Sequence, residues 1–335
     1  MNRRKALINL GLLGTAIVGV SFFHMNNREA EILNKEKGEI FADLHMHGPI
    51  GFHPHWLNVQ GYQNKNLLKL ISEECFKKNI GICSITSEEF EIPKNSIHDR
   101  FAYLVDESRN LPKEYKISKL DDVAIIVERE DKRTIIVNSQ TVIVMQPVDK
   151  DKKRFSHLVI GSNQVPNKLS LEDTIKYCQD KALIQIAEQP YLEEEFGGSG
   201  IGEELLKKYL KDYDAIEVHN AQFFVPSLFQ FLPVIGKYNN SVNEKAKEFS
   251  KLYNKPGIAV SDAHRIEDLG ISYTILNFEP DLTNGSNFIS SLKKAIKNTS
   301  PLNPRIETGY ESLLGFLDYA MKLQEGIKNK DKYGV

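Results

Sequence analysis

The sequence has little cysteine and no excess of charge of one sign. It contains three cysteines, none in a C-x-x-C pair, which argues against a disulfide framework and a zinc ribbon and leaves buried apolar thiols as the expectation. The formal net charge of -2 gives no general affinity for polyanions, so we expect no nucleic-acid partner. The chain also lacks internal repeats, which argues against a solenoid. What remains is an ordinary globular composition in a chain long enough to bury a large core.

The N-terminal segment differs from the rest of the chain. Arg3, Arg4 and Lys5 precede an uncharged and mostly apolar run from Ala6 to Phe23. This pattern is typical of a signal peptide or membrane anchor, and the paired arginines resemble a twin-arginine export signal. Cleavage and anchoring both stay open. We expect residues 1–25 to direct the protein to the exported side, with the membrane as a partner through residues 6–23 if the segment is retained.

After a polar linker at residues 26–38, apolar β-branched runs alternate with amphipathic stretches. This alternation predicts a parallel sheet built from βα units. An additional strand at 123–127 should pair with the third strand through a charged turn. We therefore predict one α/β barrel over residues 39–305, followed by a C-terminal helix and tail at 306–335. The predicted strands are 40–44, 81–86, 134–137, 157–160, 182–187, 215–218 and 257–260, and the predicted helices are 66–78, 170–181, 201–213 and 241–253.

Two polar clusters stand directly after apolar runs, one near the beginning and one near the end of the barrel sequence. The first is Asp43-Leu44-His45-Met46-His47, and the second is Ser261-Asp262-Ala263-His264. Residues i and i+2 of a strand share a face, so His45 and His47 can converge on one metal ion, and Asp262 and His264 can do the same. The carboxyl ends of parallel barrel strands meet at one face, so the two clusters predict a shared metal site.

The motifs, taken in order, resemble the PHP family, which is named for polymerase and histidinol phosphatase. The resemblance spans about residues 39 to 301 and implies a distorted (β/α)7 TIM-like barrel with divalent metals at its C-terminal face. It also implies hydrolysis of phosphate esters by a metal-activated water, with His45, His47, His157, Asp262 and His264 as ligands and Asp43 orienting a histidine. The motifs are Asp43-x-His45-x-His47, Ile85-Thr86, His157-Leu158, Ala187-x-x-Pro190, Glu217-Val218-x-Asn220 and Ser261-Asp262-Ala263-His264.

Three ligand positions depart from the family pattern. Thr86-Ser87-Glu88 stands where Thr-Asp-His is common, Asn138-Ser139-Gln140 where a bridging Glu is expected, and Ala187-Glu188-Gln189-Pro190 where Ala-His-Pro is expected. Glu88 and Gln140 stay candidate ligands. An amide in place of a carboxylate weakens binding of a hard cation, so we expect only one or two ions of Zn, Mn or Fe.

The sequence thus predicts a divalent-metal-dependent hydrolase that acts on a small phosphate ester, with His45, His47, Asp262 and His264 as catalytic residues. Arg265, directly after the last cluster, is the candidate phosphate clamp, and a salt bridge at a helix start is the alternative for it. Arg100 follows the second strand and could also reach the mouth of the barrel. The alternative function is a degenerate barrel that binds a metal or a phosphorylated ligand without turnover, in which Glu88, Glu188, His53 and His55 rebuild a different site.

Overall fold

The structure is a computed structural model that describes most of the predicted barrel. The described residues are 38–49, 57, 60–88, 99–148, 151–192, 200–223, 241–298 and 305–306. The predicted leader, the linker up to residue 37, His53, His55 and the C-terminal segment from residue 307 lie outside them. Among the described residues, no helix combines the length and the apolar character needed to cross a bilayer.

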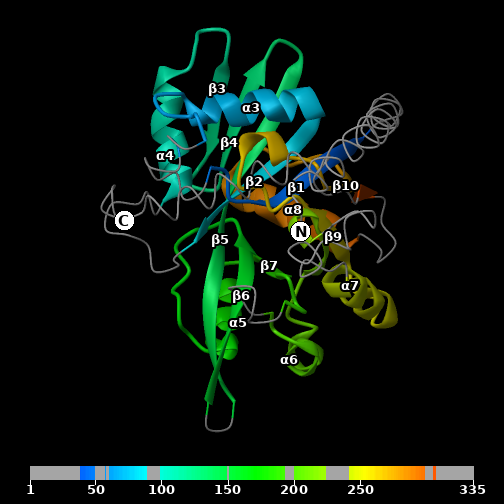
Figure 1. The fold of residues 1–335 in the computed structure, drawn as a ribbon. Coiled ribbons are helices and arrows are strands. Elements are labelled where there is room, and N and C mark those ends of the chain that lie inside the picture. Colours follow the sequence, from blue (N-terminus) through cyan, green and yellow to red (C-terminus); the bar gives the residue numbers. More distant parts are fainter. Residues whose placement is uncertain are drawn as a thin grey trace, which may run out of the picture.

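The strands of the described residues form one sheet that curls into a barrel (Figure 1). The barrel closes where the end of β1 meets the segment after β9, because Met46 pairs with Ala263. This closure confirms the predicted α/β barrel. The order along the sheet is β11 (Arg305–Ile306), β10 (Tyr273–Asn277), β1 (Glu39–Met46), β2 (Ile80–Glu88), β5 (Lys132–Val148), β6 (Asp151–Ile160), β7 (Ile184–Ala187), β8 (Ala215–Asn220) and β9 (Gly257–Val260).

The fourth predicted strand runs against its neighbours, which corrects the expectation of an all-parallel barrel. β6 pairs antiparallel with both β5 and β7, whereas β1, β2 and β5 run parallel to one another, as do β7, β8 and β9. β5 continues to Val148 and pairs there with Asp151, so the chain returns at once as a long hairpin (Figure 1). A short connection can join only antiparallel strands, because a parallel pair needs a crossover of about a dozen residues or more.

The helices pack outside the sheet and at one end of it. The four predicted helices are confirmed as α3 (Leu67–Lys78), α5 (Leu171–Asp180), α6 (Glu203–Tyr209) and α7 (Ser241–Leu252). Asn66 and Ser170 cap α3 and α5 with their side chains, which fixes where these helices begin. The structure adds elements that were not predicted, namely β3 (Lys116–Leu120), α4 (Arg100–Glu107), β10 and α8 (Gly285–Lys297). The predicted extra strand is β4 (Ala124–Arg129), which pairs antiparallel with β5.

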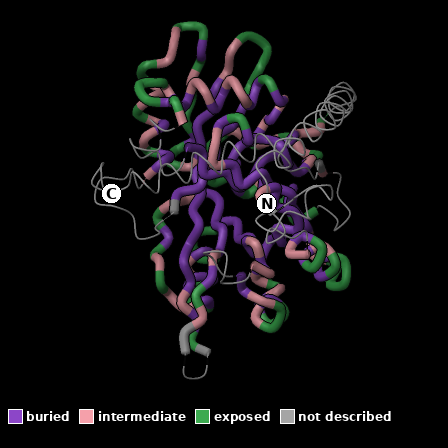
Figure 2. Tube along the Cα trace, in the orientation of Figure 1, coloured by how far each residue is buried: buried purple, intermediate pink, exposed green. Residues whose placement is uncertain are grey.

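Side chains along β6 alternate between the barrel interior and the surrounding helices. Leu158 and Ile160 join the interior cluster, which includes residues from every long strand of the barrel. Phe155 and Val159 instead pack outward against the helical layer. Figure 2 shows that the buried residues follow the barrel strands and the helix faces against them. Ile289 of α8 lies against Gly161, so α8 covers the interior from the end where β7 begins.

Candidate metal centre

The two sequence motifs meet at the C-terminal end of the barrel. The backbone N–H of Asp262 donates to His45 O over 2.9 Å, and that of His47 donates to Ala263 O over 2.9 Å. These bonds bring together segments more than two hundred residues apart in the chain. One ligand atom from each of His45, His47 and Asp262 lies within 4.8 Å of the others, and all three residues are buried. The predicted convergence of these three residues therefore occurs in the structure.

Irregularities in two strands aim the polar side chains into the centre. The pairing of β1 with β2 shifts register between Asp43 and Met46, so that both Leu44 and His45 reach the interior. β8 shifts register against β9 between Glu217 and His219. A bulge inserts one extra residue in a strand and redirects the side chains beside it. Asp262 has φ of +50°, a left-handed conformation that Asp tolerates better than most residues.

The side-chain nitrogen and oxygen atoms of the three residues lie close together. His45 Nε2 lies 3.0 Å from His47 Nε2, and Asp262 Oδ1 lies 3.3 Å from His47 Nε2 and 3.7 Å from His45 Nε2. Burial alone would lower the pKa of His45, but the carboxylates of Asp262 and Glu217 outweigh it and raise the pKa to about 10. Burial would raise the pKa of Asp262, yet the imidazoles of His45 and His47 hold it below its usual range.

The donor set fits a divalent cation. Asp262 Oδ1 is buried and makes no hydrogen bond, although its partner oxygen Oδ2 accepts from Asn220 and Gln189 over 2.9 Å and 2.8 Å. A carboxylate oxygen and two imidazole nitrogens that face one another are a donor set that one divalent cation can join. His45 Nδ1 contacts Glu217 Oε2 at 3.1 Å, and a carboxylate behind the non-ligating nitrogen is the usual arrangement of a metal-binding histidine.

Further polar residues surround this group, among them Glu188, which was predicted only for the alternative site. Glu217 takes the histidine-orienting role expected of Asp43, and Asn220 Nδ2 donates to Glu217 Oε1 over 2.7 Å. Glu188 is buried, accepts from Thr141 Oγ1 over 3.0 Å, and interacts electrostatically with His45. Burial raises the pKa of Glu188 to about 8. The signal for these residues was present in the sequence, because Glu188 and Glu217 both end predicted strands.

His264 and Asp43 lie beside the centre rather than in the three-residue group. The ring of His264 is 4.7 Å from that of His47, and its Nδ1 lies 2.8 Å from the backbone oxygen of Asp262. Asp43 accepts from the backbone N–H groups of Ser261 and Gly270 over 3.0 Å and 2.8 Å. Asp43 thus ties β1 to the loop that carries Asp262, and these two bonds go to backbone N–H groups rather than to a histidine ring.

Two candidate ligands face away from the centre. His157 lies between Phe155 and Val159 on the outer face of β6, and its Nδ1 is 3.2 Å from the hydroxyl of Tyr213. Gln140 bonds the backbone of Val165 through both amide atoms, at 3.0 Å and 2.9 Å. Successive residues of a strand point to opposite faces, so Ser139 and Thr141, not Gln140, face inward from β5.

The remaining candidates from the sequence are Arg265, Glu88 and Arg100. Arg265 donates to both carboxylate oxygens of Asp268 over 2.8 Å and 2.6 Å, which favours the alternative of a salt bridge over a phosphate clamp. Glu88 is the last residue of β2, and its side chain lies outside the described part of the structure. Arg100 does reach the centre, because its Nη1 lies 2.9 Å from His47 Nδ1.

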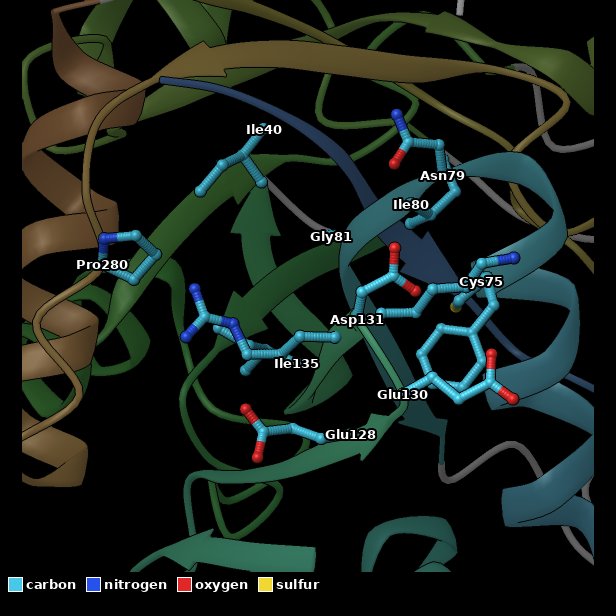
Figure 3. Close-up of a pocket in the computed structure, with 13 residues that line it drawn as sticks. Ile40, Cys75, Asn79, Ile80, Gly81, Glu128, Glu130, Asp131, Ile135 and Pro280 are labelled. Carbon is cyan, nitrogen blue, oxygen red and sulfur yellow. The ribbon is translucent and has the colours of Figure 1, made fainter. Parts of the chain in front are cut away.

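A cavity of about 580 Å³ lies at the opposite end of the barrel (Figure 3). Its lining includes Ile40, Ile80 and Ile135 near the N-terminal ends of β1, β2 and β5, together with Glu130 and Asp131 from the turn between β4 and β5. Reactive groups of such barrels gather at the C-terminal ends of the strands, whereas the other end mainly serves stability. This cavity is therefore separate from the metal centre.

Comparison with known proteins agrees with the geometry in one segment. Residues 240–295 match the family model PHP_C, described as PHP-associated, and this segment contains Asp262 and His264. No curated protein matches the chain. The match of residues 240–295 and the curled α/β sheet agree with the predicted resemblance to the PHP family.

Three solved structures resemble the chain weakly. The lesion-specific endonuclease PfuEndoQ from Pyrococcus furiosus is 14% identical with a TM-score of 0.41, over 80% of this chain and 57% of that one. PsfC from Pseudomonas syringae PB-5123 is 12% identical with a TM-score of 0.48, over 86% and 99%. A two-domain protein from Bacteroides vulgatus ATCC 8482, which contains a predicted PHP-like metal-dependent phosphoesterase, is 10% identical with a TM-score of 0.44, over 78% and 63%. Likenesses this weak do not assign a substrate.

Proposed function

We propose that this protein is a divalent-metal-dependent hydrolase of a small phosphate ester. The observation that carries the proposal is the convergence of His45, His47 and Asp262, with the buried Asp262 Oδ1 3.3 Å from His47 Nε2 and 3.7 Å from His45 Nε2. These residues would hold the ion. A bound divalent ion lowers the pKa of a coordinated water and offsets the negative charge of phosphoryl oxygens.

The surrounding residues have separate roles in this proposal. Glu217 orients His45 through Nδ1, so that Nε2 points toward Asp262. Gln189 and Asn220 fix the Asp262 carboxylate by bonding Oδ2, so that Oδ1 faces the two histidines. Glu188, a buried carboxyl group that interacts electrostatically with His45, is the candidate for proton transfer to a leaving oxygen.

The test is metal analysis of the protein together with hydrolysis of phosphate monoesters, diesters and oligonucleotides in added Mn²⁺ or Zn²⁺. The informative variant is Asp262→Asn, which keeps the shape of the side chain but removes its charge. We expect it to bind metal at least about tenfold more weakly and to lose turnover. Asp268→Asn is the matched control, because Asp268 pairs with Arg265 outside the three-residue group and should leave metal binding intact.

The outcomes separate the candidate functions. Stoichiometric metal with turnover that depends on Asp262 supports the hydrolase. Metal without turnover of any ester supports the alternative of a metal- or ligand-binding barrel. Absence of metal binding would refute both, and hydrolysis of oligonucleotides alone would refute a small phosphate ester as the substrate.

We further propose that the barrel works on the exported side of a membrane, on the basis of the signal-like residues 3–23.

A further inference from the structure

Arg100 is a buried arginine that contacts a proposed metal ligand directly. It begins α4 and is only 2% exposed. Its Nη1 lies 2.6 Å from the backbone oxygen of Thr86, 2.9 Å from His47 Nδ1 and 3.1 Å from the backbone oxygen of His47. The guanidinium is therefore fixed between the ends of β1 and β2.

The contact with Arg100 determines where His47 carries its proton. An arginine side chain has only donors, so the contact favours an Nδ1 of His47 that accepts, and the proton of a neutral ring then sits on Nε2. That nitrogen faces Asp262 Oδ1 at 3.3 Å, in position to donate to it. Ligation through Nε2 needs the opposite tautomer, with the proton on Nδ1.

The two histidines of the centre are thus arranged in opposite ways. His45 has the carboxylate of Glu217 at Nδ1, which favours a proton there, so Nε2 is the nitrogen at which a cation can replace a proton. His47 has a guanidinium at the same atom, which disfavours that tautomer and also places a fixed positive charge beside the ion. The same site therefore contains one favoured ligand and one disfavoured ligand.

The altered motif on β2 helps to hold Arg100 in this place. Ser87 stands where the PHP pattern has an aspartate, and its hydroxyl accepts from the backbone N–H of Arg100 over 3.3 Å. The backbone oxygen of the preceding Thr86 accepts from the side chain of Arg100. The segment that departs from the PHP pattern therefore also contacts Arg100 next to His47.

We propose that Arg100 is a positioning residue that holds His47 in the Nε2–H tautomer and so makes it the weakest of the three ligands. Its charge also opposes a second ion next to His47, which limits the centre to one divalent ion. The inference depends on the proposed metal centre but not on the proposed hydrolysis.

The first measurement needs neither metal nor activity. Nitrogen-15 NMR of the histidine rings, recorded on the full chain in chelator at one fixed pH, distinguishes protonated from unprotonated Nδ1 and Nε2. We expect wild-type His47 to be protonated at Nε2, and Arg100→Met to shift it toward the Nδ1–H tautomer. Arg100→Lys keeps a charged donor and should retain the wild-type pattern. A wild-type His47 that carries its proton on Nδ1 would overturn the proposal.

The second measurement is titration with Co²⁺, followed by its visible absorption. We expect the wild type to bind one equivalent, and Arg100→Met to bind Co²⁺ about tenfold more tightly or better. Arg265→Met is the matched control, since it removes a neighbouring arginine that pairs with Asp268, and it should bind like the wild type. A merely structural role for Arg100 predicts weaker binding in Arg100→Met, and that result would refute the inference.

The two measurements keep the inference separate from the proposed function. If the wild type binds no Co²⁺, the proposed hydrolase fails, while the tautomer of His47 still decides the role of Arg100. If Arg100→Met does not fold, the wild-type spectrum and the Arg100→Lys variant carry the test.

Discussion

Replacing His157 with glutamine is expected to make the protein more resistant to acid. The imidazole is fully buried, its Nδ1 faces the hydroxyl of Tyr213, and its Nε2 has no hydrogen-bond partner. Burial lowers the pKa of His157 from 6.5 to about 4. Because protonation of the buried ring is unfavourable in the folded protein, acid favours the unfolded chain.

The size of the effect follows from the two pKa values. The folded pKa lies below the unfolded one, so the contribution of His157 is fully favourable above pH 6.5 and is lost as the pH falls toward 4. Between pH 8 and pH 5 the free energy of unfolding should fall by about 2 kcal/mol through this residue alone. Glutamine has a similar volume and does not titrate, so His157→Gln should not show this loss.

The assay is urea denaturation of the wild type and the variant at pH 8 and at pH 5. The other titrating groups are common to both proteins, so the difference between the two pH-dependent losses isolates His157. Val159→Ala is the control, because it changes the same face of β6 without removing a titratable group and should lower stability equally at both pH values. Equal acid sensitivity of His157→Gln and the wild type would refute the reasoning.

Three further variants test the construction of the metal centre. Glu217→Gln presents a neutral amide to His45 Nδ1 and should weaken metal binding about 10- to 100-fold with little change in the unfolding midpoint, as measured by metal titration and thermal unfolding. Asp43→Ala removes the carboxylate that accepts from two buried backbone N–H groups, and we expect a loss of about 2–4 kcal/mol in urea denaturation. Gly200→Ala places a Cβ 2.4 Å from Pro190 O, so it should displace the neighbouring Gln189 from Asp262. We expect this variant to lose about 1–3 kcal/mol of stability and to bind Co²⁺ more weakly. Unchanged Co²⁺ binding would contradict this prediction.

Much of the fold could be predicted because its signals are local. Apolar β-branched runs marked seven barrel strands, and polar amphipathic stretches marked four helices. The strand β10 and the helix α8, which complete the barrel, were missed, although Asn284 caps α8. The direction of β6 was also missed. A short apolar strand looks the same whether it runs parallel or antiparallel, and only the tight return from β5 decides its direction.

The candidate site, like the fold, could be predicted only in part from the sequence. The sequence alone determined that His45, His47 and Asp262 stand at strand ends, because H-x-H and Asp-x-His after apolar runs are local patterns. Only the tertiary structure decided that Gln140 and His157 face outward, that Glu217 stands behind His45, and that Arg100 stands behind His47. The physical reason is that a side chain's partner is set by strand register, bulges and barrel closure, which join residues far apart in the chain.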